Sequence, residues 1–346
     1  MKKLLYIALI LIIFSSCEKV ILGDEETNNP INNYNLFWND IDQHYGLFTA
    51  RDRNWDSINI VFEPQVTAST TDAQLFAIFS QMIEYLDDSH TYIGNPATNQ
   101  YYVSGNTLNV QAIDEFSLVL VKSKYIDNYT NVADNDEFGY GKIINKNIGY
   151  IYLGKMDDND PTKIDHVIAS LKTQKAIILD IRNNGGGDDA FAGRIAGAFA
   201  DGEHFIYTVQ TRNGQKHTDF DAISKHFAKP QGTEQFLKPV IVLTDRYTIS
   251  AGEVFLLHMK SFPQVTQIGD TTAGDFSTTS NNRFLPNGWT FQYSIQMFLL
   301  PNGQSLDGTG HIPQVYIKNT QADISSQNDK VIEKAIDYLW LTYGIQ

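Results

Sequence analysis

The chain has 346 residues, 42% of them apolar, which is enough for one large domain or two of modest size. It carries 26 Lys and Arg against 40 Asp and Glu, so its formal net charge is −14. Because such an acidic surface repels phosphate backbones, the composition argues against nucleic acid as a partner.

The N-terminus has the pattern of a secretory signal. Lys2 and Lys3 precede an unbroken apolar run over residues 4–14, and small residues follow it. The run is too short to span a bilayer as a permanent helix, and a charged start before a short apolar stretch typifies a cleaved signal. We expect a signal peptide over residues 1–16 and a polar tether over residues 17–33.

Cys17 is the only cysteine of the chain, so it cannot form an internal disulfide. It directly follows Ser15 and Ser16, and this position resembles the bacterial lipoprotein signal, in which the cysteine becomes the lipid-bearing first residue. An ordinary signal peptide with a chance cysteine is the alternative. The lipoprotein interpretation implies a lipid anchor in the cell envelope, at the outer membrane of a Gram-negative bacterium, with the leaflet left open.

Residues 34–95 are expected to form a helical region. Apolar side chains recur every four positions at Phe37, Ile41 and Tyr45. A further helix is expected after Thr71, because Gln74 completes a capping box with it and an apolar face follows for three turns. This helix is expected to end near residues 87–88 and to leave the next two residues in a loop.

Residues 96–140 are expected to form a reduced β-segment, with short β-type runs over residues 107–123 and a polar loop over residues 127–139. From residue 141 onward, expected strands alternate with expected helices. The strands lie at residues 148–153, 176–181, 239–243 and 289–299; the helices begin near residues 160, 188 and 250, and a closing helix covers residues 331–339. Apolar strands joined by helices are typical of a parallel sheet covered on both faces, so we expect an α/β core over residues 141–346.

Ser250 is expected at a strand-to-helix turn. The apolar strand over residues 239–243 is followed by a short loop, and Ser250 then opens a helix. A serine in this position presents its hydroxyl at the carboxyl end of the sheet, where ligands bind in open α/β folds, and the amides of the helix start are available to an oxyanion. Ser250 is therefore a candidate nucleophile. A serine that only caps the helix is the alternative.

A nucleophilic serine needs a base, and the chain has eight histidines. His258 lies two turns along the helix from Ser250, a rise of about 12 Å, and is too distant to take its proton. His90 stands in a loop between Ser89 and Thr91, polar residues able to orient an imidazole. His90 is the candidate base, and a solvent-facing histidine without a chemical role is the alternative.

A glycine-rich turn, Asn183-Asn184-Gly185-Gly186-Gly187, joins a buried strand to a helix. Its glycines allow positive φ and the close approach of another backbone, so the turn is able to present amide hydrogens to a developing negative charge. A phosphate cradle or a plain tight connection are the alternatives. No Lys-Ser/Thr pair follows the turn, as it would in a nucleotide-binding loop.

Three motifs in this order resemble the tail-specific or C-terminal processing serine peptidases. They are residues 178–187, Ser250-Ala251-Gly252-Glu253 and residues 269–274, and the resemblance runs from about residue 86 to residue 315. One arrangement in this family is a Ser-Lys dyad, whose lysine place is held here by Asp275, so the dyad is absent. The Asp-Asp-Ser-His step at residues 87–90 is similar instead to the Ser-His arrangement of the tricorn core protease and the retinoid-binding-protein-like relatives.

The resemblance implies a role for each matching residue. Ser250 is the expected nucleophile, His90 the general base and Ser89 the residue that orients it. Asp307 stands where the family has a glutamate, and its carboxylate is expected to accept a hydrogen bond from Ser89. The expected oxyanion hole consists of the backbone amides of Ala251 and of Gly186 or Gly187.

The resemblance also implies a crotonase/ClpP-like βα core with a small N-terminal helical region. Many members carry a PDZ module, but the stretch between His90 and Ile148 is shorter than a full PDZ fold of about 80–100 residues. The reduced β-segment is therefore expected in its place.

The sequence predicts a serine-type endopeptidase of the cell envelope that cleaves peptides or protein C-terminal regions by acyl-enzyme chemistry. No cofactor or metal is expected. The expected substrate is a peptide or an unfolded protein. A non-catalytic lipoprotein that binds a peptide or an apolar ligand on the same fold is the alternative, and a hydrolase of non-peptide esters or amides would use the same chemistry.

Overall fold

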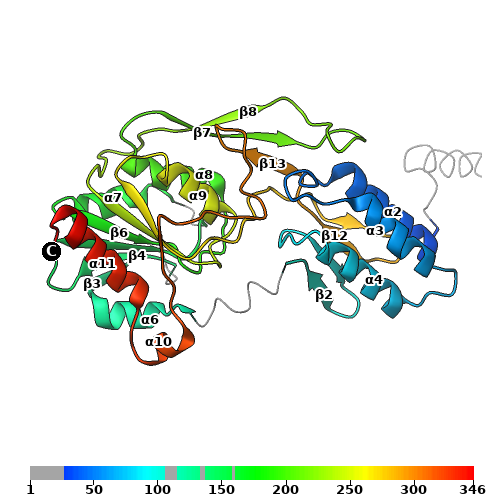
Figure 1. Cartoon of the computed structure of the whole chain (residues 1–346), viewed down its shortest axis with the longest axis horizontal. Coiled ribbons are helices and arrows are strands. Elements are labelled where there is room, and N and C mark those ends of the chain that lie inside the picture. Colours follow the sequence, from blue (N-terminus) through cyan, green and yellow to red (C-terminus); the bar gives the residue numbers. More distant parts are fainter. Residues whose placement is uncertain (1–26, 106–114, 133–136, 158–159) are drawn as a thin grey trace, which may run out of the picture.

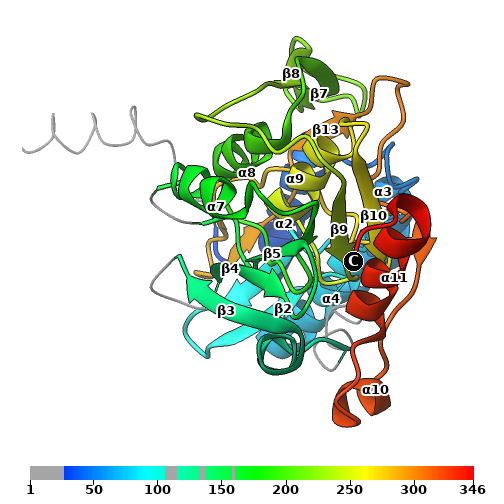
Figure 2. The ribbon, with the colours of Figure 1, turned by 90° about the vertical axis from the view of Figure 1, so that its left-hand side faces the viewer.

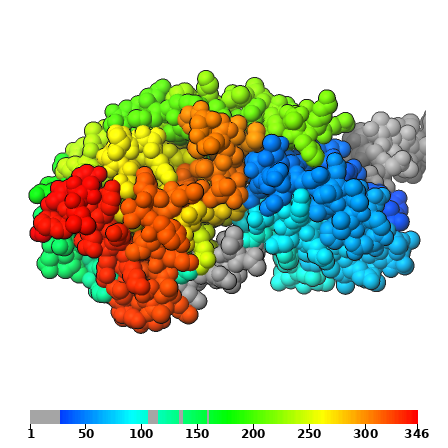
Figure 3. Space-filling view, viewed as in Figure 1, coloured from blue at the N-terminus to red at the C-terminus, as the bar shows by residue number. Residues whose placement is uncertain are grey.

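The computed structural model describes residues 27–105, 115–132, 137–157 and 160–346. The expected signal peptide and Cys17 lie outside these residues. The described chain forms two lobes, a helical lobe built from residues 27–105 and 283–293 and a core lobe built from the remainder (Figure 1). In the space-filling view the blue and cyan helical lobe meets the core through green and orange segments (Figure 3). Among the described residues, every helix is too short or too polar to cross a membrane.

Three helices pack together in the helical lobe. They are α2 (Pro30–His44), α3 (Trp55–Phe62), which continues into the short η1 (Glu63–Gln65), and α4 (Asp72–Glu84). Helix α2 begins inside the expected tether, because the Asn29 side chain accepts from the amide of Asn32 and Pro30 occupies the first turn. Helix α4 has the predicted capping box between Thr71 and Gln74, but it ends at Glu84, before the predicted end near residues 87–88.

A four-stranded antiparallel sheet of order β11-β12-β1-β2 completes this lobe. Its strands are β1 (Tyr92–Asn95), β2 (Gln100–Val103), β11 (Arg283–Phe284) and β12 (Thr290–Gln292). Two of them come from the C-terminal half of the chain, and Tyr92 pairs with Gln292. Apolar side chains of both halves, such as Phe79 and Trp289, share one buried cluster. The helical lobe is therefore closed by late residues rather than by residues 34–95 alone.

The core lobe contains a seven-stranded sheet of order β14-β10-β9-β6-β5-β4-β3. Its strands are β3 (Ile126–Asn131), β4 (Phe138–Ile143), β5 (Ile148–Leu153), β6 (Ala176–Asp180), β9 (Val240–Thr244), β10 (Val265–Gly269) and β14 (Val315–Tyr316). The five strands from β14 to β5 are parallel, β4 pairs with β5 in antiparallel orientation, and β3 pairs with β4 in antiparallel orientation. The predicted α/β class and the parallel sheet are confirmed.

Helices cover both faces of this sheet (Figure 2). Helices α7 (Lys163–Leu171), α8 (Asp189–Ala196), which continues into η4 (Gly197–Phe199), and α9 (Ala251–Met259) cover one face, and α11 (Lys330–Tyr343) covers the other, preceded by the short α10 (Gln321–Ser325). Side chains alternate between the two faces, so Ile177 packs in one cluster and Ile178 in the other. Because both faces of the sheet are covered, β6 is apolar at every position from Ala176 to Leu179.

The structure corrects four local predictions. Residues 127–139, predicted as a loop, include most of β3 and the first part of β4. The β-type runs predicted over residues 107–123 include residues that form α6 (Leu118–Leu120) and the start of a single π-type turn, η3 (Val121–Tyr125). The segment 96–140 is divided, since β2 belongs to the helical lobe and β3 to the core sheet. The run 289–299 forms two strands, because β12 pairs with β1 whereas β13 (Gln296–Leu299) pairs with β7.

A three-stranded sheet of order β13-β7-β8 lies along the upper edge of the molecule, beside both lobes (Figure 1). Strand β7 (His204–Thr211) pairs with β8 (Ser224–Ala228) on one side and with β13 on the other. Just after β7, the guanidinium of Arg212 donates to the carbonyl oxygens of Asp42 and Gln43. This sheet therefore joins the core to the helical lobe.

Candidate active site

Ser250 lies at the turn between β9 and α9, as the sequence predicts. Its backbone has φ 57° and ψ −126°, a conformation that costs a non-glycine residue of order 1–3 kcal/mol. Its side chain makes no capping hydrogen bond to the helix. A serine held in a strained conformation without acting as a cap is difficult to explain as a structural residue only.

The glycine-rich turn lies directly against Ser250. A Cβ placed on Gly186, whose φ is 86°, would lie 2.6 Å from the Cβ of Ser250, so only glycine fits there. The Asn184 carbonyl accepts from the amide of Ile249 at 3.0 Å, and the Asn184 side chain donates to Leu153 at 2.7 Å. These bonds hold the turn against the residue before Ser250 and against the end of β5.

Two backbone amides beside Ser250 are available to an oxyanion. The amides of Gly187 and Ala251 have no hydrogen-bond partner among the described residues. The amide of Gly186 donates to the Asn184 side chain at 2.9 Å and is therefore already used. Of the two glycines that the sequence left open for this role, Gly187 has the free amide.

His90 lies in the loop between α4 and β1, as predicted. Its backbone amide donates to the buried carboxylate of Asp88 at 3.0 Å, and the Thr91 hydroxyl donates to the same carboxylate at 3.0 Å. Burial opposes ionisation of Asp88, but the nearby charges of Arg51 and His90 outweigh it and lower the pKa of Asp88. The Nδ1 atom of His90 is buried and has no partner among the described residues.

Asp275 connects the loop that contains His90 to the turn that contains Ser250. The Ser89 hydroxyl donates to the Asp275 carboxylate at 2.5 Å, and the Ser250 amide donates to the Asp275 carbonyl at 3.1 Å. The guanidinium of Arg51 donates to the same carboxylate and to the Gly274 carbonyl. Burial raises the pKa of Asp275, and the charge of Arg51 opposes this shift.

The prediction that Ser89 donates a hydrogen bond to Asp307 is wrong. The carboxylate of Asp307 accepts from the Phe276 amide at 3.1 Å and from the Ser305 hydroxyl at 3.2 Å. Burial raises the pKa of Asp307 to about 7. The short side chain thus binds its own loop and the residue after Asp275, and Asp275 accepts the hydrogen bond from Ser89 instead.

Two residues that support this arrangement were missed by the sequence analysis. The buried carboxylate of Glu253 accepts from the Thr272 hydroxyl at 2.6 Å and from the amides of Gly274 and Asp275, each at 2.8 Å. Burial raises its pKa to about 8. Glu253 and Arg51 together fix the turn that carries Asp275. The sequence holds no local signal for Arg51, because its contacts lie far along the chain.

The other buried histidines have structural surroundings. His258 packs against Tyr207 with ring centroids 6.3 Å apart, and burial lowers its pKa to about 4. His311 contacts the carbonyl of Glu253 through Nε2 at 3.1 Å, and burial lowers its pKa to about 3. Within the described part of the chain, no group of three His, Cys, Asp or Glu side chains is arranged to hold a metal ion.

A cavity of about 760 Å³ begins where the glycine-rich turn ends. It lies between the first turn of α8, the second half of α9 and the β13-β7-β8 sheet. Its lining includes Asp189, Ala190, Tyr207, Val209, His258 and Phe298. The cavity is of the size that proteins use for ligands, and it mixes apolar with polar side chains.

Comparisons with known proteins point to a family of peptidases. Residues 147–317 match the model of Peptidase family S41. The chain is 28% identical over 178 residues to the carboxy-terminal processing protease CtpA of Bacillus subtilis, covering 51% of this chain and 36% of that protein. It is 31% identical over 187 residues to the tail-specific protease of Haemophilus influenzae, covering 48% of this chain and 24% of that protein. The match thus spans well under half the length of these relatives.

A solved structure resembles nearly the whole chain. The crystal structure of a candidate peptidase from Parabacteroides merdae superposes with a TM-score of 0.81 at 27% sequence identity. The match covers 90% of this chain and 97% of that one. Both lobes of the described chain therefore have a counterpart in a single known structure.

Proposed function

Because residues 147–317 form a domain of peptidase family S41, we propose that this chain is a serine peptidase with Ser250 as nucleophile and His90 as general base. The observation that carries the proposal is the strained backbone of Ser250, whose hydroxyl does not cap its helix. Two further observations support it: free amides flank Ser250, and Asp275 bonds both the Ser250 amide and Ser89.

The reaction follows acyl-enzyme chemistry. His90 takes the proton from Ser250 as Oγ attacks the carbonyl carbon of the scissile peptide, and the amides of Ala251 and Gly187 stabilise the oxyanion. His90 then gives the proton to the leaving amine, which departs as the C–N bond breaks. Water, deprotonated by His90, attacks the ester and restores Ser250. Asp275 acts through Ser89 as a positioning residue.

The proposed substrate is a peptide or an unfolded protein chain. The cavity beside α8 starts at Asp189, two residues after Gly187, and offers room for side chains next to the scissile bond. The matched relatives are named as processing and tail-specific proteases, which favours a peptide over a non-peptide ester. A binding protein without catalysis would have no use for a strained serine beside two free amides.

A serine-directed fluorophosphonate probe tests the proposal. The purified chain is expected to be labelled at Ser250, and Ser250→Ala should abolish the label while leaving the thermal melt close to that of wild type. Mass spectrometry of a peptide library after incubation then separates cleavage of peptide bonds from hydrolysis of esters. Equal labelling of both proteins, or no cleavage by wild type, would contradict the assignment.

We also propose that the chain is anchored in the cell envelope by a lipid on Cys17. The lone cysteine at the end of the apolar run supports this proposal, and the polar residues after it provide a tether. Cells fed a labelled fatty acid should incorporate it into wild type and not into Cys17→Ser. Label retained in the variant would remove the anchor.

A further inference from the structure

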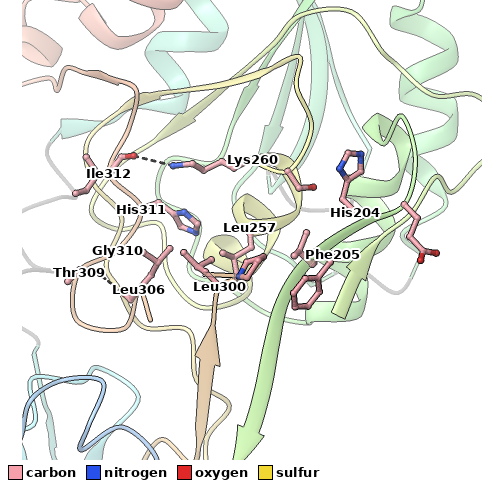
Figure 4. A pocket seen from close by; sticks show the side chains of 14 residues that line it. His204, Phe205, Leu257, Lys260, Leu300, Leu306, Thr309, Gly310, His311 and Ile312 are labelled. Carbon is pink, nitrogen blue, oxygen red and sulfur yellow. Dashed lines mark hydrogen bonds between the residues drawn. The ribbon is translucent and has the colours of Figure 1, made fainter. Parts of the chain in front are cut away.

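A second cavity, also of about 760 Å³, lies at the end of α9, and Ser250 is not among its lining residues (Figure 4). Its walls come from the start of β7, the end of α9, the segment after β13 and the loop over residues 306–312. Half of its lining residues are apolar: Phe205, Ile206, Leu257, Leu300, Pro301, Leu306 and Ile312. The proposed peptidase reaction uses none of these side chains.

Apolar side chains around this cavity are left open to solvent. Ile312 is 72% exposed and Phe205 is 37% exposed, although both are large apolar residues. Exposed apolar side chains gathered around a concavity typically mark a surface that is covered by a ligand. The occupant of this cavity is therefore expected to be largely apolar.

Lys260 provides the single uncompensated charge among the described residues of this wall. Its Nζ donates to the Gln267 side chain at 2.8 Å and to the Ile312 carbonyl at 3.1 Å, and it forms no ion pair with a described carboxylate. Burial lowers the pKa of Lys260. An ammonium has three donors, so one of them is left for a ligand.

Two neighbouring polar side chains of the wall already have partners. His204 lies 2.6 Å from the carboxylate of Asp201, and Glu203 lies 2.9 Å from the ammonium of Lys229. In Figure 4, Lys260 runs along one side of the cavity to the carbonyl of Ile312. A half-buried cation beside an apolar surface is stabilised by a ligand that combines an anionic group with an apolar group.

The loop over residues 306–312, which contains Ile312, is fixed by hydrogen bonds to residues 272–274. The His311 amide donates to the Thr272 hydroxyl at 2.7 Å, and the Gly308 amide donates to the Gly274 carbonyl at 2.8 Å. A Cβ on Gly310 would lie 2.2 Å from the Thr272 carbonyl, which shows how closely the two segments pack. The cavity is therefore preformed, which reduces the entropy that a ligand must lose on binding.

We propose that this cavity binds an apolar monocarboxylate, with the carboxylate on Lys260 and the apolar part against Leu257, Leu300 and Phe205. Two sources share this chemistry: a medium-chain fatty acid and the C-terminal carboxylate of an apolar peptide. The site does not require the proposed peptidase activity, so the two proposals fail separately.

Calorimetry on the full chain carrying Ser250→Ala tests the proposal without turnover. Decanoate below its micelle concentration represents the fatty acid, and acetyl-Leu-Leu represents the peptide C-terminus. At least one of them is expected to bind at a ratio of one per chain. Its uncharged counterpart, decanol or acetyl-Leu-Leu-amide, should bind more weakly by about tenfold or more, because it lacks the charge-assisted hydrogen bond to Lys260.

Lys260→Met should lower the affinity for the carboxylate by about tenfold or more and leave the affinity for the uncharged counterpart nearly unchanged. Lys260→Arg, which keeps the charge, should retain most of the affinity. Lys238→Met is the matched control, because Lys238 also bonds only carbonyl oxygens but lies away from the cavity. Absence of binding by both carboxylates, or equal losses in Lys260→Met and Lys238→Met, would overturn the proposal.

Discussion

Replacement of His90 and replacement of His258 are expected to have different effects on the reaction of Ser250. His90 lies in the loop whose Ser89 is tied to Asp275, whereas His258 is buried two turns along α9. His90→Ala is expected to lower kcat/KM by about 10³–10⁶, since base and nucleophile act as one unit. His258→Ala should leave kcat near that of wild type, because the residue is too distant to take the proton. Steady-state kinetics on a peptide substrate measures both; the reverse order would identify His258 as the base.

Asp275 and Asp307 allow the positioning role to be assigned to one carboxylate. Asp275→Asn removes the charge that accepts from Ser89, and we expect kcat to fall by about 10–10³ with little change in KM, because orientation of His90 matters in the transition state. Asp307→Asn should lower kcat less, since its carboxylate bonds Phe276 and Ser305. A larger loss of kcat in Asp307→Asn would restore the role expected for it from the sequence.

The buried carboxyl of Asp307 predicts a pH-dependent stability. Burial raises its pKa from an ordinary 3.8 to about 7, so the folded state retains a proton that the unfolded state has lost. The contribution of the protonated Asp307 carboxyl to the free energy of unfolding is complete below about pH 4, and it is lost as the pH rises to about 7. Denaturant titrations should show the stability of Asp307→Asn improving relative to wild type over this range. A difference that stays constant with pH would mean that Asp307 is ionised throughout.

The sequence correctly predicted a turn at Ser250 and a loop at His90, but it assigned the wrong carboxylate to Ser89. A strand, a turn and a helix are local patterns, so the position of Ser250 follows from neighbouring residues alone. The bond from Ser89 to Asp275 joins residues that are 186 positions apart, and the one from Arg51 to Asp275 spans 224. Hydrophobic periodicity carries no information on such contacts, and the family pattern pointed to Asp307.

In the turn before α8, the adjacent residues Gly185 and Gly186 differ in the space around them. A Cβ on Gly186 would lie 2.6 Å from Ser250, whereas a Cβ on Gly185 would meet no atom within 4 Å. Gly186→Ala is expected to displace Ser250, lower kcat by about 10² or more and reduce thermal stability, because misplacement by about 1 Å has this effect on rate. Gly185→Ala should resemble wild type in both measurements. Similar kinetics for the two variants would show that the turn does not position Ser250.

Element boundaries were predictable where local signals agree with tertiary packing. Helix α4 carries both a capping box and one apolar face, and the structure confirms it. Strand β3 carries neither signal, since most of its residues are exposed at the edge of the sheet, and it was taken for a loop. The run over residues 289–299 has an apolar residue at every second position from Trp289 to Leu299, so its unbroken alternation does not reveal that the chain passes from one sheet to another.

The two lobes are joined by a buried ion pair. Arg51 follows the first helix of the helical lobe, is 7% exposed, and donates to the carboxylate of Asp275 and to the carbonyl of Gly274 in the core. The same guanidinium donates to the carbonyl of Asp87, three residues before His90. Arg51 therefore connects the loop that contains His90, the turn that contains Asp275 and the interface between the lobes.

Replacement of Arg51 tests whether this connection holds the molecule together. Arg51→Met leaves the Asp275 carboxylate buried without its cation, and we expect a loss of about 3–5 kcal/mol in the free energy of unfolding. The pKa of Asp275 should rise further, so kcat should fall most at low pH and recover in part as the pH rises. Arg53→Met is the matched control: Arg53 pairs with Asp87 at 3.6 Å near the surface and should contribute less than about 1 kcal/mol.

The double variant Arg51→Met/Asp275→Asn separates charge from packing. If the main damage in Arg51→Met is the unpaired carboxylate, then removing that charge should restore part of the lost stability, although each single change is destabilising. Denaturant titration of the four proteins measures this coupling, and the kinetics should remain poor because Asp275 no longer orients Ser89. Additive losses would show that Arg51 joins the lobes through its bonds to the carbonyls of Asp87 and Gly274 and not through its charge.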